Sequence, residues 1–366
     1  MNKKFITAII SLILVLSALC ACSAAPNRPY IKGHEDHYAE YFPPQNATCR
    51  EEGSIGYYFC HDCNLYISQS APYEELTREQ AVIARLSHSF RDGVCDICGF
   101  DSLKGLEFIL ISEEIGYKVV GNRNQLSDQL LIPSTHNGKP VVEIAPKAFK
   151  DCVSLKEIQI PDSIKRIGIS TFEGCFPQKI TLPFIGESEE ENRFLGFIFG
   201  AEFLHSADMY IPSSLKEISL TDNCKTIPKA AFRGCKDLVT INLNKVEAIG
   251  LGAFSGCINL QEIKISNIDQ WLDITFDSPI PTPFRLTVDG RVVNTVKAGG
   301  SNKIQPFTFT NCLSVKTLIL SKDIKSFDLK GIENSYLSSI IFEGSKEGFS
   351  ALTDIDKIQI PLSFEE

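Results

Sequence analysis

Cysteine and histidine gather near the start of the chain. Of its 13 cysteines and 6 histidines, five cysteines and four histidines lie between residues 34 and 98. They include two Cys-x-x-Cys pairs, Cys60 with Cys63 and Cys95 with Cys98. A two-residue loop aims both thiolates at one ion, and two such pairs are typical of a tetrahedral structural zinc site.

Two ligand arrangements fit this spacing. In the first, one zinc ion takes all four cysteines of the two pairs. In the second, His34 or His37 joins Cys49 and the first pair, whereas His88 joins Cys95 and Cys98 in another site. Disulfides are the alternative in an exported protein, although five cysteines cannot all pair among themselves. We expect a small Cys/His module over residues 34–102, held by structural zinc on Cys49, Cys60, Cys63, Cys95, Cys98, His34 and His88.

The segment between the two pairs shows helix-like spacing of apolar residues over 73–86. A catalytic zinc would need an open position and a nearby carboxylate base. The neighbours His61 and Asp62 are the only hint of such a base. We therefore expect a structural module.

The first residues resemble the signal peptide of a bacterial lipoprotein. Lys3 and Lys4 precede an apolar run over 5–19, which is shorter than the roughly 20 residues that a membrane-spanning helix needs. Leu19 and Ala21 stand before Cys22 as the aliphatic and small residues stand in a lipobox. The resemblance implies a signal peptide over 1–21, lipid on Cys22, a linker over 22–33 and an exported, outward-facing protein tied to the membrane by lipid.

From residue 103 the chain repeats. The motif around Ala148-Phe149 and Cys152 recurs at Phe172 and Cys175, 23 residues later. Further copies stand around Cys235, Cys257 and Cys312. A fixed period of 22–23 residues, with alternating apolar positions, predicts a mainly β solenoid of short strands in which the repeated phenylalanines stack as an internal spine.

These repeats resemble the BspA-like leucine-rich-repeat surface proteins over about 103–345. The opening hairpin around Gly116, the turn at Ile132-Pro133 and the insert that ends at residues 210–216 all match that family's pattern. The sequence departs from it around Lys297 and loses the Phe-Cys signature after Cys312. The resemblance implies a surface-exposed, non-enzymatic role in binding or adhesion.

A strand ladder leaves every second side chain outward, which gives a surface that can vary without disturbing the core. The candidate binding residues on it are Lys156, Glu157, Lys216, Glu217, Thr240, Glu262 and Lys264. The alternative is a solvated face with no ligand.

Other conspicuous residues have ordinary structural interpretations. The repeat cysteines are expected as small buried residues, and the single tryptophan, Trp271, as a packing residue. The acidic run at Glu187 and residues 189–191 is expected to be a solvated loop. A net charge of −9 argues against nucleic acid as a partner.

The function expected from these residues is recognition of an extracellular or envelope protein or glycan by a lipid-anchored, non-catalytic solenoid. The linker from Ser23 to Gly33 reaches about 40 Å at most, which favours an alternative as a scaffold or accessory subunit of an envelope complex. A minor alternative is an exported metal-dependent hydrolase.

Overall fold

The computed structural model describes residues 37–49, 51–70, 73–83, 85–86, 90–91 and 94–365. The chain divides into two compact units, the first from Met1–Ala47 and Glu52–Ala84 and the second from Thr48–Glu51 and Arg85–Glu366. The sequence predicts one border between the Cys/His module and the solenoid, at residue 102. In the structure the chain crosses between the units several times, because the short excursion Thr48–Glu51 belongs to the second unit.

The first unit is built on a four-stranded antiparallel sheet in the order β1-β3-β4-β5. Its core contains Tyr58, Cys60 and Ile67, which lie on the buried side of the central strands. The elements are β1 (Ala39–Phe42), β2 (Gly53–Ser54), β3 (Tyr57–Cys60), β4 (Leu65–Ser68), β5 (Glu75–Leu76), α2 (Arg78–Ala81) and β6 (Val82–Ile83).

The helix-like spacing over 73–86 does not produce a long helix. Helix α2 is one turn, which begins at a capping box between Thr77 and Gln80. It ends at Val82, which with Ile83 forms β6 and pairs with β2. Strand pairing of these β-branched residues overrides the helical pattern.

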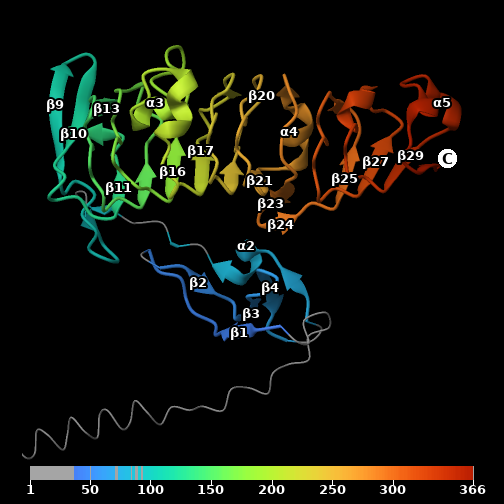
Figure 1. Ribbon diagram of the computed structural model, residues 1–366, viewed down its shortest axis with the longest axis horizontal. Helices are drawn as coiled ribbons and strands as arrows, with labels where there is room; N and C mark the ends of the chain where they lie inside the picture. Colours follow the sequence, from blue (N-terminus) through green and yellow to red (C-terminus); the bar gives the residue numbers. More distant parts are fainter. Residues whose placement is uncertain are drawn as a thin grey trace, which may run out of the picture. The chain divides into compact units, whose positions relative to one another are not determined.

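The second unit is the predicted solenoid of short parallel strands. Figure 1 shows its coils side by side, with the β9–β10 hairpin at one end and α5 at the other. No helix in the part of the chain that the structure describes is both long and apolar enough to cross a bilayer.

The bounds of its elements are β7 (Phe90–Arg91), β8 (Val94–Cys95), β9 (Leu106–Ser112), β10 (Gly116–Gly121), β11 (Gln129–Leu131), β12 (Thr135–His136), β13 (Lys139–Ile144), β14 (Glu157–Gln159), β15 (Arg166–Ile167), β16 (Lys179–Leu182), α3 (Gly196–Phe199), η1 (Leu204–Met209), β17 (Glu217–Leu220), β18 (Thr226–Ile227), β19 (Thr240–Asn242), β20 (Ala248–Ile249), β21 (Glu262–Ile265), α4 (Ile268–Asp273), β22 (Thr275–Phe276), β23 (Arg285–Val288), β24 (Arg291–Val292), β25 (Thr295–Ala298), β26 (Lys303–Ile304), β27 (Thr317–Ser321), β28 (Ser326–Phe327), η2 (Leu329–Gly331), β29 (Ser339–Glu343), α5 (Lys346–Ser350), η3 (Ile355–Lys357) and β30 (Leu362–Phe364).

One eight-stranded sheet, in the order β11-β14-β16-β17-β19-β21-β23-β24, positions the candidate binding residues. Its strands are parallel and in register from β11 to β23. The inward residue of each strand is a buried isoleucine or leucine, as the alternating pattern predicts. These inward residues are Leu130, Ile158, Ile180, Ile218, Ile241, Ile263 and Leu286.

The predicted phenylalanine spine is confirmed for two stacked pairs. The rings of Phe149 and Phe172 stack with their centroids 5.6 Å apart, and those of Phe232 and Phe254 with theirs 5.4 Å apart. In the insert, which lacks the repeat motif, Phe199 of α3 packs against Phe172 and continues the spine.

The solenoid continues regularly after Cys312, although the repeat signature does not. Strands β25, β27, β29 and β30 form a second parallel sheet. The residue before five of the six repeat cysteines, all except Cys224, has a positive φ, including Gly174 at 73° and Asn311 at 62°. Asn334, with φ of 53°, occupies the equivalent turn in the next coil, where Ser335 replaces the cysteine. The backbone geometry of the coil therefore persists after its cysteine is lost.

Candidate metal centres and binding surface

The first group of possible metal ligands comprises His37, Cys60 and Cys63, whose ligand atoms all lie within 4.8 Å of one another. Cys60 ends β3, and Cys63 lies in the turn that leads into β4. His37 precedes β1, which pairs with β3 and so brings the imidazole to the turn. Its Nδ1 lies 3.6 Å from the Cys60 Sγ and 3.0 Å from the Cys63 Sγ.

Both residues between these cysteines take part in fixing the group. The Asp62 carboxylate accepts a hydrogen bond of 2.6 Å from the backbone N–H of Tyr38, directly after His37. His61 stacks on the Tyr38 ring, and its Nε2 lies 2.9 Å from the Glu40 carboxylate. His61 and Asp62, which the sequence offered as a possible catalytic base, therefore hold β1 against the turn.

The second group comprises Cys49, Cys95 and Cys98, again with all ligand atoms within 4.8 Å. Cys95 ends β8, and Gly99 closes the turn with a φ of 69° and an N–H bond of 2.8 Å to the Cys95 carbonyl. Cys49 comes from the excursion Thr48–Glu51. Its Sγ lies 3.9 Å from that of Cys95, and both side chains are buried.

The separation of 3.9 Å between the Cys49 and Cys95 sulfurs suits a tetrahedral ion. Zinc–sulfur bonds of about 2.3 Å at tetrahedral angles place two sulfurs about 3.8 Å apart. Burial, together with hydrogen bonds to Cys98 and Cys95, raises the pKa of the Cys49 thiol to about 11. Burial also raises the pKa of the Cys63 thiol. A bound cation would supply the positive charge that such thiols need to ionise at neutral pH.

The structure contradicts the first ligand grouping and corrects the second at one ligand. The two Cys-x-x-Cys pairs lie in different groups, as the second grouping predicts, but Cys49 joins the second pair instead of the first. The physical reason is the excursion, which carries residues 48–51 into the second unit. His34 and His88, the remaining predicted ligands, lie outside the described residues, as does Cys22.

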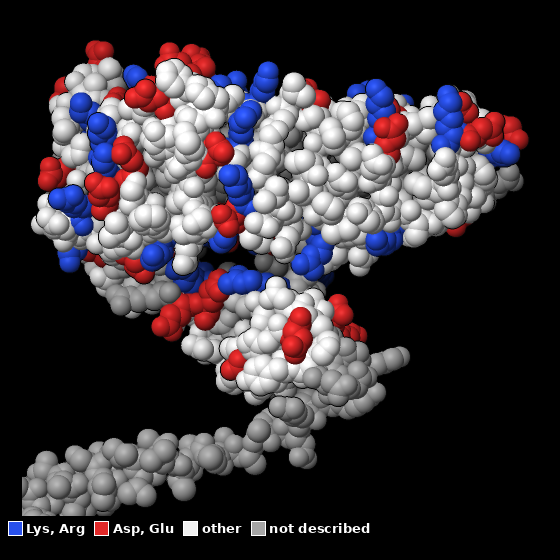
Figure 2. Space-filling model, in the orientation of Figure 1, with Lys and Arg blue, Asp and Glu red and all other residues white. Residues whose placement is uncertain are grey.

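The predicted binding residues lie on the outward face of the large sheet or directly beside it. One outward row contains Glu217, Thr240 and Glu262 in register, and a second contains Lys264. Lys156 and Lys216 are exposed just before β14 and β17, outside these rows. On the face of the second unit drawn in Figure 2, acidic and basic side chains are interspersed.

Glu157 was predicted as a binding residue, and the structure contradicts this. Its side chain is buried, because Arg85 forms an ion pair with its carboxylate and the Gln159 amide donates to it at 3.1 Å. It is therefore a structural residue.

Several other residues on this face are paired with each other. The Lys179 ammonium lies 3.1 Å from the Glu217 carboxylate, and the Lys216 ammonium lies 3.0 Å from that of Asp237. Glu262 accepts hydrogen bonds from the hydroxyls of Thr240 and Thr287. The surface is polar, and many of its charges are already satisfied within it.

The acidic loop is only partly solvated. Residues 189–191 are exposed as expected, but Glu187 is buried. Its carboxylate accepts hydrogen bonds from the Arg166 guanidinium and the Asn192 amide, each at 2.6 Å. Trp271 is fully buried and donates its indole N–H to the Thr308 carbonyl, so its predicted packing role is confirmed. The six repeat cysteines are also buried, as expected.

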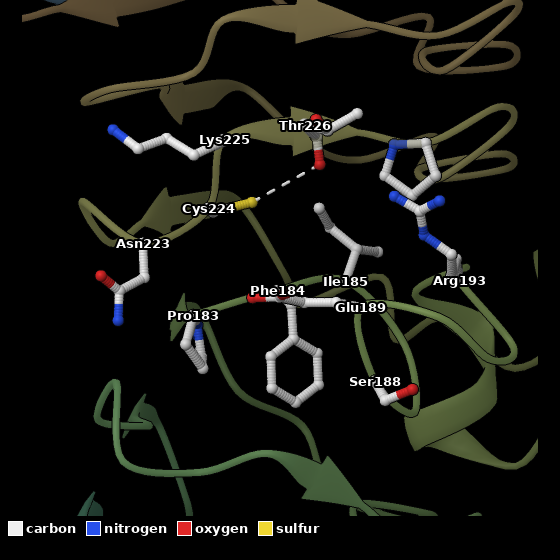
Figure 3. Close-up of a pocket in the computed structure, with 11 residues that line it drawn as sticks. Pro183, Phe184, Ile185, Ser188, Glu189, Arg193, Asn223, Cys224, Lys225 and Thr226 are labelled. Atoms are coloured by element: carbon white, nitrogen blue, oxygen red, sulfur yellow. Dashed lines mark hydrogen bonds between the residues drawn. The ribbon is translucent and has the colours of Figure 1, made fainter.

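A pocket of about 180 Å³ lies between the insert and the next coil (Figure 3). Its lining includes Phe184, Arg193 and Cys224, whose thiol donates to the Thr226 carbonyl at 3.8 Å. Burial raises the pKa of the Cys224 thiol to about 12, so it stays protonated and a poor nucleophile at neutral pH.

Comparison with known proteins supports the interpretation of the repeats. The family model described as "BspA type Leucine rich repeat region" matches six copies, over residues 128–196, 206–278 and 294–366. No curated protein matches the chain.

Solved structures similar to the chain include a leucine-rich repeat protein of T. pallidum, at 19% identity over 69% of this chain and 89% of that one, with a TM-score of 0.24. A leucine-rich cell surface protein of Faecalibacterium prausnitzii is 14% identical over 74% and 98%, with a TM-score of 0.22. The pneumococcal vaccine antigen PcpA is 13% identical over 63% and 73%, with a TM-score of 0.27. TM-scores this low do not support a conclusion about fold or function. The assignment of the chain to a repeat family rests on the family model alone.

Proposed function

Because the chain belongs to the BspA-type leucine-rich repeat family, we propose that it is a non-catalytic binding protein that recognises an extracellular or envelope protein or glycan. The observation that carries this proposal is the continuous sheet from β11 to β23, whose outward rows are polar from β14 onward and whose inward row forms the core. Such a face tolerates variation and contacts a partner over many coils.

The part of this face that best fits a ligand is its centre. Thr181 and Ser219 lie side by side there in register on β16 and β17, in the row beside the Lys179–Glu217 ion pair. Both are half-buried and small, so they leave room for a partner's side chains or sugar rings. The ion pairs around them keep the surface ordered before a ligand arrives, which lowers the entropy cost of binding.

The binding test uses the chain from Ser23 onward, without the leader. Purified chain is measured against a panel of extracellular-matrix proteins, cell-wall polysaccharides and mammalian glycans. In the test variant, Thr181→Arg and Ser219→Arg place two bulky charges at the centre of the face. In the matched control, Val153→Arg and Ile258→Arg place the same charges at exposed positions after two repeat cysteines.

We expect at least one probe to bind the wild type and the control but to lose most of its affinity for the test variant. Equal binding by both variants would exclude the sheet face, and binding to no probe would favour the solvated alternative.

We further propose that the protein is exported and held to the membrane by lipid on Cys22. Metabolic labelling with an alkyne fatty acid in a bacterial host tests this. Labelling should disappear in Cys22→Ala and persist in Cys20→Ala, its neighbour in the leader. Labelling that survives Cys22→Ala would contradict the assignment.

The Cys/His residues are proposed to bind zinc structurally. The described donors supply three ligands in each group, and His34 and His88 are the remaining predicted ligands, His34 for the first group and His88 for the second. Together these would give one site of two cysteines and two histidines and one of three cysteines and one histidine, both common for structural zinc.

An envelope scaffold or accessory subunit is the second candidate function. The short segment between Cys22 and the module favours it, because a reach of about 40 Å would keep the solenoid close to the membrane.

A further inference from the structure

We infer that the chain holds two zinc ions in two separate sites, and that the site of Cys49, Cys95 and Cys98 fixes the excursion Thr48–Glu51 to the start of the solenoid unit. This rests on the structural zinc proposed above and goes beyond it by giving each site its own role, the second as the link that holds the excursion. The first site, with His37, Cys60 and Cys63, holds the sheet of the first unit.

The separation into two sites follows from the pairing of the strands. The β1–β3 and β3–β4 ladders confine the first group to one end of one antiparallel sheet. The second group is formed by the turn after β8 and by Cys49, which precedes that turn by 46 residues. Each turn ends in a left-handed residue, Asn64 or Gly99, so the two are equivalent ligand loops on different supports.

The role of the second site follows from the path of the chain. The chain leaves the first unit after Ala47, contributes four residues to the second and returns at Glu52. The excursion folds on itself through hydrogen bonds between Thr48 and Glu51, and the Thr48 carbonyl accepts a backbone hydrogen bond of 2.9 Å from Leu86. A metal on Cys49 adds a cross-link from this short segment to the turn at residues 95–98, and such links are strongest when they close long loops.

The ligand chemistry points to zinc or another thiophilic divalent cation. Two of the three thiols in the second site are almost fully buried, and the group contains no described oxygen donor. Thiolates select soft or borderline cations, whereas calcium and magnesium prefer oxygen ligands.

The first experiment counts zinc by mass spectrometry in the chain from Ser23 onward, purified without added metal. The wild type should carry two zinc ions per chain, and Cys49→Ser and Cys63→Ser should each carry one. Cys152→Ser, at a buried repeat cysteine, is the control and should keep two. Cys49→His restores a zinc ligand at the same position and should return the count to two, which separates lost coordination from misfolding.

The outcomes separate two claims, that the chain has two separate zinc sites and that it binds structural zinc at all. One ion in the wild type that disappears in Cys63→Ser and in Cys95→Ser would mean one shared site, which overturns the inference but leaves structural zinc intact. No zinc, with cysteines protected from alkylation before any chelator is added, would mean disulfides and overturn both.

The second experiment tests the role of the excursion with a glutamate-specific protease, since Glu51 and Glu52 are exposed. Cys49→Ser should be cut at this point about tenfold faster than the wild type, because local opening controls cleavage. Cys63→Ser should be cut there at the wild-type rate. Equal rates in Cys49→Ser and the wild type would show that the second site does not hold the excursion.

Discussion

At the residue scale, several side chains have roles that residue type alone does not reveal. Glu187 stands in an acidic run that predicts a solvated loop, yet its carboxylate is buried against Arg166 and Asn192. Glu157 has an outward register position and is nevertheless covered by Arg85. In both residues a partner distant in sequence decides the burial, and a strand or loop pattern contains no information about such partners.

The buried carboxylate gives a stability prediction. Glu187→Ala should lower the free energy of unfolding by about 1–3 kcal/mol, because it leaves the Arg166 and Asn192 donors without their acceptor. Glu190→Ala, at an exposed neighbour, should change it by less than about 0.5 kcal/mol. Urea denaturation of both variants measures the difference. Equal effects would mean that the Glu187 contacts contribute no stability.

A second ion pair predicts a pH dependence. The Lys150 ammonium lies 2.6 Å from the Glu173 carboxylate and holds the pKa of that carboxyl below its usual value. The stabilisation is therefore present above the unfolded-state pKa of about 4.3 and is lost as the pH falls through the lower folded-state pKa.

Since the pair is about one-third exposed, the ion pair should contribute little. The free energy of unfolding of the wild type should exceed that of Glu173→Gln by only about 0.2–1 kcal/mol at pH 7. Denaturation from pH 7 down to pH 2.5 should show the difference disappearing. A difference that grows with acid would contradict the assignment.

At the element scale, the repeat motif predicts the coil from its most regular positions. The glycine, aspartate or asparagine before every repeat cysteine except Cys224 marks a left-handed turn, and the alternating isoleucines mark the strands. A second left-handed position lies two residues before the spine phenylalanine, and the sequence does not reveal it. It carries lysine, serine, alanine, glycine or phenylalanine at 147, 170, 230, 252 and 307, so composition gives no signal.

This hidden position gives a prediction of increased stability. Lys147 is exposed with a φ of 59°, and a left-handed conformation costs a side-chain-bearing residue about 1–2 kcal/mol. Lys147→Gly should raise the free energy of unfolding by up to about 1 kcal/mol, and the midpoint of denaturation with it. The gain is smaller than the strain relieved, because glycine makes the unfolded chain more flexible. Lys147→Ala retains the strain and serves as the control. A destabilised glycine variant would contradict the account.

The spine gives a prediction of the opposite sign. Phe232 is fully buried and stacks on Phe254, so Phe232→Ala should cost about 3–5 kcal/mol through lost burial and a cavity. Phe232→Leu fills more of that space and should cost clearly less. Thermal unfolding of the two variants measures both losses. Equal losses would mean that packing of this ring does not control the stability of the coil.

At the scale of the whole molecule, the sequence predicts the solenoid well and the organisation of the Cys/His residues less well. The solenoid is local, because each coil packs on its neighbours at a fixed period. The grouping of Cys49 with Cys95 depends instead on where the chain crosses between two units, which no period records. Family membership follows from repeats over more than half of the chain, whereas the ligand and the lipid anchor remain proposals.

The central claim is that a lipid-held solenoid faces outward and is open to an external partner. A site for a sequence-specific protease inserted after Gly33, with protease added to intact cells, tests it most directly. We predict that the solenoid is released into the medium from intact cells and that Cys22→Ala is found there without protease. A chain that stays with intact cells, and is cut only after lysis or removal of the wall, would contradict the claim and favour the envelope scaffold.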